Sequence, residues 1–166
     1  ESFSSFYDYN SSMYIPYKER FFTFKPDNHN LMYESFKGPV GNFYGENKES
    51  YIEFISNPEP LVECEFNNLE FKDECADENE IEKMETFDTI EVTNEFQDSG
   101  EVQLKPKFNL RKLNRKWRVS IPRSNKVNRM RNTWVKIRLK SNNENNYEHR
   151  VDDIAVFYRP NNKTFN

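Results

Sequence analysis

The chain has 166 residues, with 28 acidic and 24 basic side chains and a formal net charge of −4 at pH 7. This length suits one domain, or two small domains that share a core. Alanine, the best helix former, occurs only at Ala76 and Ala155, whereas the chain contains 15 Phe and nine Tyr. Because aromatic residues favour strands, the composition argues against a helical bundle and favours β structure.

The N-terminal region, residues 1–45, has the pattern of a β-meander. Residues 13–24 predict two short strands around a charged turn, and residues 31–33 predict a third strand. Three of the four glycines lie within residues 38–45, which predicts a loop with tight bends. This meander could complete a propeller blade that a larger parent protein supplies.

The middle region, residues 46–103, is acidic and predicts further strands. Residues 50–56 form one, and residues 61–66 alternate apolar and charged positions as a half-buried strand does. That strand is expected to continue past a kink at Asn67 and Asn68. Residues 72–85 are acidic and poor in large apolar groups, so they predict a solvated loop, with a short helix as the alternative. Residues 86–96 alternate well and predict the next strand.

The basic region, residues 104–166, completes the predicted sheet structure. Residues 117–121 and 134–140 alternate apolar and charged positions, and the second segment has the cleanest pattern in the chain. Residues 151–158 predict the last strand, with a bulge or an irregular start at Asp152 and Asp153. No helices long enough for crossovers separate the strands, so we expect antiparallel pairing. The predicted fold is mainly β, an antiparallel β-sandwich-like domain, and the three regions are expected to form one compact unit.

The net charge hides a strong asymmetry between the two parts of the sequence. Residues 1–103 carry 24 acidic and 7 basic side chains, whereas residues 104–166 carry 4 acidic and 17 basic ones. Such halves could pair within one chain or between neighbouring copies. The candidate basic face comprises Arg111, Lys112, Arg115, Lys116, Arg118, Arg123, Arg129 and Arg131. The candidate acidic face comprises Asp73, Glu74, Asp77, Glu78 and Glu80.

The residues that most often carry catalysis or hold metals are few. Cys64 and Cys75 predict two free thiols, although a bridge is possible if their strands lie side by side. His29 and His149 have no companion motif, and they predict exposed histidines. Two distant histidines and two cysteines do not supply a zinc pattern. We therefore expect a protein without enzymatic activity, cofactor or metal.

Two binding functions remain open as alternatives to a structural role. The basic stretch from Arg111 to Arg131, with Trp117 and Trp134 nearby, could bind nucleic-acid phosphates. The competing interpretation, which we favour, is that these cations meet the acidic half. Tyr7, Phe43 and Tyr44 could form an aromatic platform for a cell-surface glycan, and the competing interpretation is that they belong to the core.

The apolar runs and the first residue of the chain lead to expectations about secretion, membrane insertion and processing. Residues 1–30 lack the apolar segment of a signal peptide, and no run approaches the roughly 20 apolar residues of a membrane-spanning helix. We therefore expect no membrane-spanning segment. The first residue is Glu1 rather than Met, which leads us to expect a processed product or a fragment of a longer protein.

Several segments together resemble one known protein family. They are Met13–Tyr17, Gly41–Gly45, Ser50–Pro58, Thr86–Ile90, Asn94–Gln97, Arg115–Arg123 and Arg129–Val135. Their order and spacing over residues 3–158 are similar to the C-terminal part of the tail stabilization protein, also called the muzzle or nozzle, of crAss-like bacteriophages.

The resemblance implies a structural virion protein in the distal tail of a short-tailed phage, assembled in the cytoplasm of the bacterial host. It implies a homo-oligomeric ring of six copies, contacts with the rest of a parent tail protein and with other tail and adaptor proteins, and DNA that passes through without being specifically bound. The chain would then be a C-terminal piece that proteolysis could release. The family offers no catalytic residue to carry over.

Overall fold

The structure is a computed structural model that describes residues 11–35 and 37–161, without the side chains of Asn28 and His29. The described residues form fifteen strands and no helix, and all pairings between these strands are antiparallel, which confirms the mainly β prediction. Accordingly, this part of the chain contains no helix that could cross a membrane. The chain divides into two compact units, Glu1–Lys48 and Glu49–Asn166.

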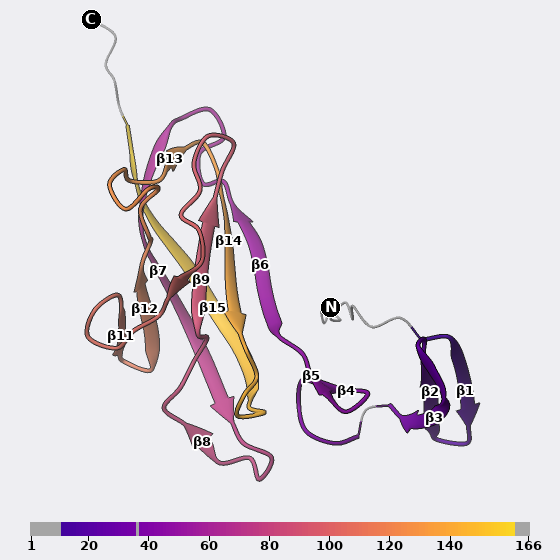
Figure 1. Cartoon of the computed structure of the whole chain (residues 1–166). Helices are drawn as coiled ribbons and strands as arrows, with labels where there is room; N and C mark the ends of the chain where they lie inside the picture. The colour runs from indigo at the N-terminus through magenta and orange to yellow at the C-terminus, as the bar shows by residue number, and fades with distance from the viewer. Residues whose placement is uncertain (1–10, 36, 162–166) are drawn as a thin grey trace, which may run out of the picture. The chain divides into compact units, whose positions relative to one another are not determined.

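The strands follow one another along the chain as labelled in Figure 1. Their bounds are β1 Met13–Tyr17, β2 Arg20–Lys25, β3 Asn28–Glu34, β4 Asn42–Phe43, β5 Glu46–Asn47, β6 Ser50–Ser56, β7 Cys64–Ala76, β8 Glu82–Lys83, β9 Thr89–Thr93, β10 Val102–Gln103, β11 Leu110–Leu113, β12 Lys116–Ser120, β13 Arg131–Asn132, β14 Val135–Ser141 and β15 Glu148–Pro160.

The first unit is built around a three-stranded meander. Strands β1, β2 and β3 pair in sequence order, as residues 13–24 and 31–33 predicted. A two-residue turn joins β1 to β2, and its Lys18 has φ 54°. Thr23 is the one described residue of the unit that is fully buried. The sheet therefore exposes apolar side chains, namely Met13, Tyr14, Ile15, Tyr17, Leu31 and Met32.

A short hairpin of β4 and β5 follows in the same unit. Its two turn residues, Tyr44 and Gly45, have φ 55° and 77°, the conformation that matches the right-handed twist of paired strands. The ring of Tyr44 meets the ring of Tyr33 edge to face, with centroids 5.0 Å apart. The ammonium group of Lys25 pairs with the carboxylate of Glu46. These contacts hold the hairpin against the meander.

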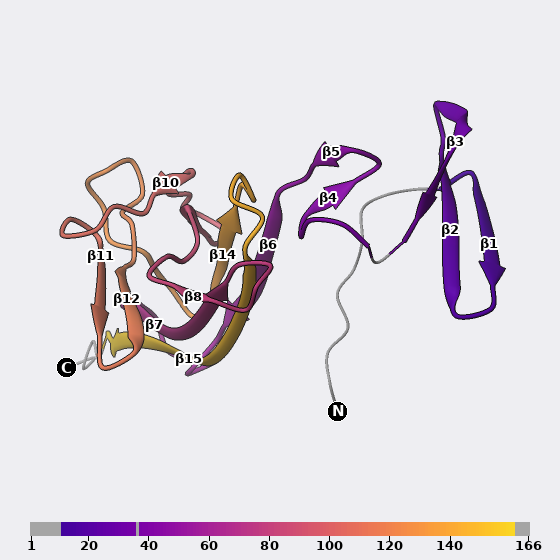
Figure 2. The same ribbon diagram turned by 90° about the horizontal axis from the view of Figure 1, so that it is seen from below.

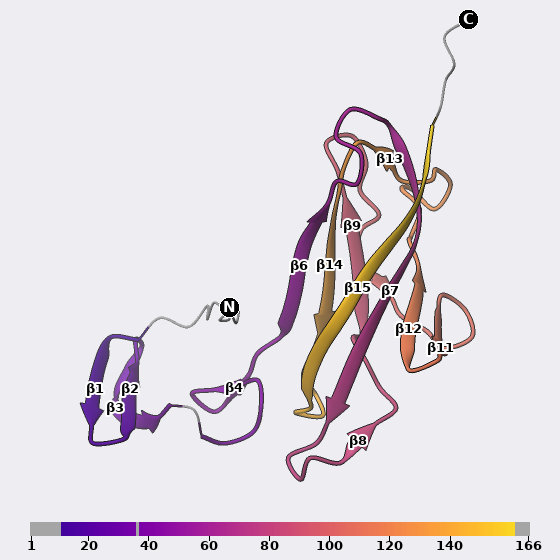
Figure 3. The same cartoon turned by 180° about the vertical axis from the view of Figure 1, so that it is seen from behind.

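The second unit consists of two antiparallel sheets. One has the strand order β10-β9-β14-β6, and the other follows β11-β12-β7-β13 with β15 and β8 also paired to β7. Viewed from below, the strands of both sheets curve around a common interior (Figure 2). From behind, the long strands β7 and β15 run side by side along the unit (Figure 3). This arrangement agrees with the predicted sandwich-like architecture.

The core of the second unit is formed by the inward positions of its central strands. Strand β14 alternates buried and half-buried residues along its whole length, as the period-2 pattern of residues 134–140 predicted. Its Ile137 and Leu139 belong to one buried cluster with Leu69 of β7 and Trp117 of β12. The two sheets are therefore joined by one continuous apolar layer.

Two irregularities in the long strands were anticipated from the sequence. In β7 the buried positions change phase at Asn67 and Asn68, and the pairing with β15 skips one residue there. In β15 the register shifts between Asp152 and Ala155, and Asp153 has φ 51°. Both are β-bulges, which bend a strand and increase its twist. They confirm the predicted kink and the predicted bulge.

The prediction of a solvated loop over residues 72–85 was wrong for its first part. Strand β7 continues to Ala76, and both Asp73 and Cys75 are buried. The error came from equating acidic character with exposure. Asp73 and Cys75 are in phase with Phe71, so they share its inward face, while the intervening charged residues face outward. The loop itself begins after Ala76 and contains the two-residue strand β8.

One carboxylate links the short strand β13 to β7. Glu65 accepts hydrogen bonds from Nη2 of Arg131 at 2.7 Å and from Nη1 of Arg129 at 2.9 Å. Arg131 is also the residue that faces Glu65 in the strand pairing. The hydrogen bond from Arg131, together with the positive charges of both arginines, lowers the pKa of Glu65 below its ordinary value of 4.5.

We expect Leu69→Ala to lower the free energy of unfolding by about 2–5 kcal/mol, because it leaves a cavity in the shared core. Leu61→Ala is the matched control, since Leu61 is 97% exposed whereas Leu69 is 0% exposed. The control should change stability by no more than about 0.5 kcal/mol. Urea unfolding followed by tryptophan fluorescence measures both. Equal effects of the two substitutions would contradict the position of the core.

We expect Glu65→Gln to make stability less sensitive to acid. A lowered folded-state pKa means that the unfolded chain binds the proton first, so the contribution of Glu65 is fully present above its ordinary pKa of 4.5 and is lost as the pH falls through the lowered value. Urea unfolding at a series of pH values below 4.5 should therefore show a shallower decline for the variant. Parallel declines would show that the ion pairs of Glu65 do not stabilise the fold.

Candidate functional site

The predicted basic residues lie on strands β11, β12 and β13 of one sheet and in the turns and loops that connect these strands. Strands β11 and β12 pair so that Arg111 stands directly beside Arg118. Trp117 and Val119 of β12 are buried in the core, so the residues between and beside them face outward. The structure therefore brings Arg111 and Arg118 together on the outer face of this sheet.

Four of the eight residues in the predicted basic face form ion pairs with carboxylates of the acidic half of the same chain. Arg118 lies 3.5 Å from Glu70, Lys112 lies 3.8 Å from Glu82, and Glu65 binds both Arg129 and Arg131. Arg118 also lies over the ring of Phe157, 5.5 Å from its centroid. These contacts agree with pairing of the two halves within one chain.

The other four residues of the predicted basic face form no ion pair with described residues of the acidic half. Lys116 lies 3.8 Å from Asp153, which belongs to the basic half. Arg123 donates a hydrogen bond from Nη1 to the carbonyl oxygen of Val127 at 3.2 Å. Within the described residues, Arg111, Arg115 and Arg123 have no ion-pair partner. Two of these three, Arg111 and Arg123, border the same depression in the surface.

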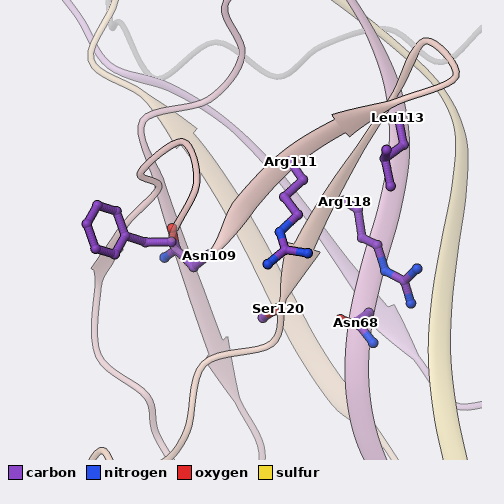
Figure 4. Close-up of a pocket in the computed structure, with 7 residues that line it drawn as sticks. Asn68, Asn109, Arg111, Leu113, Arg118 and Ser120 are labelled. Atoms are coloured by element: carbon purple, nitrogen blue, oxygen red, sulfur yellow. The ribbon is translucent and has the colours of Figure 1, made fainter.

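This depression crosses the outer face of the sheet. It consists of two adjoining hollows, with volumes of about 260 and 250 Å³, that share Asn68 and Ser120. We call it the arginine groove, and its principal polar residues are Asn68, Arg111, Arg118, Ser120, Arg123 and Arg129. Figure 4 shows the side chains of Arg111 and Arg118 on the same side of the sheet, with Asn68 and Ser120 near them.

The groove is suited to an anionic group. Guanidinium groups bind carboxylates and phosphates through paired N–H donors, and amide and hydroxyl groups add further donors. Two apolar side chains border the groove, those of Phe108 and Leu113. They are 83% and 55% exposed. Asn68, Ser120 and Phe108 were not singled out as site residues from the sequence. The alternation around Trp117 could have placed Ser120 on the outward face, but the pairing of β12 with Asn68 required the structure.

The five residues of the predicted acidic face do not form one face. Asp73 points into the core, and its neighbour Glu74 points outward and pairs with Lys72 at 2.5 Å. Asp77 accepts a hydrogen bond from Lys83 at 2.6 Å. Glu78 and Glu80 are exposed in the loop that follows. Adjacent residues of a strand face opposite sides, so the burial of Asp73 excludes it from an exposed face, whereas Glu74 faces outward.

A buried polar cluster around Asp73 was missed. Asp73 Oδ2 accepts a hydrogen bond from the hydroxyl group of Thr86 at 2.7 Å and lies 2.9 Å from Nδ1 of His149. The ring of Phe87 stacks on His149, with centroids 4.9 Å apart. His149 is therefore largely buried, which corrects its prediction as an exposed residue. The side chain of His29 is not among those that the structure describes, so its exposure stays a prediction.

The remaining sequence candidates have ordinary structural positions. Cys64 and Cys75 are free and buried, as expected. Both lie on the extended strand β7, eleven residues apart, which is too far for a bridge within the chain. Burial raises the pKa of the Cys75 thiol to about 11.

The aromatic residues that suggested a glycan platform are not fully exposed where they are described. Phe43 and Tyr44 are half-buried in the β4–β5 hairpin, and Tyr7 lies outside the described residues. The described part of the chain contains no group of three or more His, Cys, Asp or Glu side chains that could hold a metal ion.

Comparisons with known proteins identify the family. Residues 38–124 match the model of the crassvirus muzzle protein C-terminal domain. The chain is also 36% identical over 133 residues to the muzzle protein of Bacteroides phage crAss001. That match covers 76% of this chain and 10% of the relative, so the chain spans about a tenth of the length of the curated protein that it matches. The resemblance drawn from the sequence is confirmed, and the chain belongs to the family of crassvirus muzzle protein C-terminal domains.

Proposed function

We propose that the chain is a structural component of the virion of a crAss-like phage, located in the tail muzzle through which the genome is ejected. The observation that carries this proposal is the match of residues 38–124 to the muzzle C-terminal domain, together with 36% identity to a muzzle protein. The domain acts by contacting other macromolecules and not by catalysis.

The partners in this proposal are further copies of the chain, the rest of its parent tail protein, and other tail and adaptor proteins. Six copies form a ring, and the particle assembles in the cytoplasm of the bacterial host. A ring requires two different surfaces that fit one another, because each copy contacts the next in a head-to-tail manner. The arginine groove and the exposed carboxylates of residues 77–85 supply unlike surfaces on one chain.

We further propose that DNA passes the domain without being specifically bound. The charges on the β10-β9-β14-β6 sheet support this, since the outward cations of β14 are matched by carboxylates of its neighbours. Arg138 lies 2.6 Å from Glu53 of β6 and 3.3 Å from Glu91 of β9. Lys140 lies 3.1 Å from Glu49 and 3.2 Å from Glu101. Cations engaged in this way offer little to passing phosphates, whose binding depends on free positive charge.

Peptide mapping by mass spectrometry of purified virions, separated on a denaturing gel, tests the proposal. We expect peptides from residues 49–161 in the virion, and we expect them in tails separated from capsids. A band near 20 kDa would show that the segment is released by proteolysis and stays bound, whereas a much larger band would show that it remains part of its parent protein. Absence of these peptides from the virion would refute the structural assignment.

A further inference from the structure

We propose that the arginine groove of one copy binds the acidic loop of a second copy, where the acidic loop denotes residues 77–85. The inference rests on the proposed role in a multi-copy tail structure, and it assigns the two surfaces that meet. The groove supplies unmatched positive charge, and the loop supplies unmatched negative charge. Each surface has features that favour the other.

The groove contains a repulsion that a carboxylate would relieve. Arg111 and Arg118 face each other directly across β11 and β12, and like charges in that position destabilise a sheet. Arg118 has one carboxylate within reach, that of Glu70 at 3.5 Å, and Arg111 has none among the described residues. A carboxylate seated between the two guanidinium groups would neutralise the pair and receive charge-assisted hydrogen bonds.

The acidic loop presents carboxylates on a preformed tip. Residues 77–85 contain five carboxylates and one lysine. Oδ1 of Asp77 accepts hydrogen bonds from the backbone N–H groups of Asn79 and Ile81, both at 3.0 Å. These bonds fix the turn, so less conformational entropy is lost when the loop binds. Glu78 and Glu80 are exposed, and neither has an ion-pair partner among the described residues.

Apolar side chains accompany the charges on both surfaces. In the loop, Ile81 is 57% exposed and Met84 is 73% exposed. At the edge of the groove, Phe108 and Leu113 are exposed in the same way. Exposed ion pairs contribute little binding free energy, whereas burial of apolar surface contributes more. The exposed apolar side chains on both surfaces therefore favour a protein partner.

The loop contacts β11 of its own chain, but it does not place its free carboxylates in the groove. Nζ of Lys112 lies 3.8 Å from Oε1 of Glu82 and 3.3 Å from Sδ of Met84. Glu78, Glu80 and Arg111, in contrast, have no ion-pair partner among the described residues. The groove crosses β7 at Asn68, and the loop begins after Ala76, eight residues farther along the strand. At 3.3 Å per residue, Asn68 and Ala76 are about 26 Å apart along the strand. Figure 1 shows β8, which lies within the loop, at the end of β7. The proposed contact of Glu78 and Glu80 with the groove therefore joins two copies, and since the two surfaces differ it is a head-to-tail contact.

A nucleic acid fits the groove less well than the acidic loop does. Glu65, Glu70 and Glu74 lie on the outer positions of β7, beside the groove and along the same sheet. A phosphate backbone that crosses this face would pass these carboxylates at close range, and the repulsion would offset the attraction of the arginines. A hairpin tip, in contrast, can place two carboxylates in the two hollows and avoid the remainder of the face.

A charge-swap experiment on the full 166-residue chain tests this contact. The groove variant is Arg111→Glu with Arg123→Glu, two exposed residues without ion pairs in the described structure. The loop variant is Glu78→Lys with Glu80→Lys. The control for the groove variant, Lys18→Glu with Lys37→Glu, makes the same change in net charge as that variant, but within the other unit. Circular dichroism and urea unfolding check that every variant folds.

We expect the native chain and the control to self-associate in sedimentation velocity, more weakly at high salt. The groove variant alone and the loop variant alone should each associate at least about tenfold more weakly, a loss of about 1.4 kcal/mol. An equimolar mixture should regain association, because each acidic groove then meets a basic loop and each basic groove meets an acidic loop.

Three results would overturn the proposal. They are a native chain that stays monomeric up to about millimolar concentration, variants that associate as the native chain does, and a mixture that fails to regain association. Duplex DNA serves as a competing probe, and DNA binding lost only in the groove variant, with self-association unchanged, would assign the groove to phosphate instead. If the mixture fails to regain association while peptides of residues 49–161 are found in virion tails, the proposed contact is refuted and the structural role in the virion still stands.

Discussion

The apolar contact between the inner faces of the two sheets in the second unit is the interaction on which its other features depend. Strand β7 is central to it, because β7 pairs with β15 along one edge and with β12, β13 and β8 along the other. Leu69 and Phe71 of β7 are fully buried and share one cluster with Val92 of β9 and Ile137 of β14. Once these inward residues are buried, the intervening residues must face solvent, and this places the charged side chains in rows.

The outward rows explain the uneven distribution of charge in the sequence. Residues 1–103 are strongly acidic and residues 104–166 are strongly basic, yet in the fold strands of one group pair with strands of the other. Strand β14 pairs with β6 and β9, and β7 pairs with β12, β13 and β15. Strand β14 of the basic half lies between β6 and β9 of the acidic half, so that Arg138 faces Glu53 on one side and Glu91 on the other. Individual surface ion pairs contribute little stability, but rows of opposite charge favour the correct register over shifted pairings. The groove and the acidic loop stand out as places where this matching is incomplete.

Much of the fold could be predicted from alternation alone. The strand predicted at residues 50–56 has those bounds in the structure, and the phase change at Asn67 and Asn68 is real. Strand β11, by contrast, was not predicted, because Leu110–Leu113 alternates over only four residues and is recognised as a strand by its pairing with β12. Asp73 and His149 were misplaced for another reason. Their burial depends on a hydrogen bond between residues 76 positions apart, and local sequence carries no signal of that partner.

The candidate site was less predictable than the fold. The cluster of cations between Arg111 and Arg131 was evident, but alternation cannot show which of them find partners, because each partner lies on a strand distant in sequence. Glu65 and Glu70 engage three of the arginines, which leaves Arg111 and Arg123 as the cations of the groove without carboxylates. The family is established by the comparisons, and the unmatched charge of these described residues is the basis for the proposed contact.

Electron cryomicroscopy of intact virion tails, at a resolution that shows side chains, would test the central claim most directly. The account predicts repeated copies of the sandwich of residues 49–161 in the tail, with the acidic loop of one copy seated in the arginine groove of the next. A tail in which this domain is absent, or in which the groove faces DNA or open solvent while other surfaces join the copies, would contradict it.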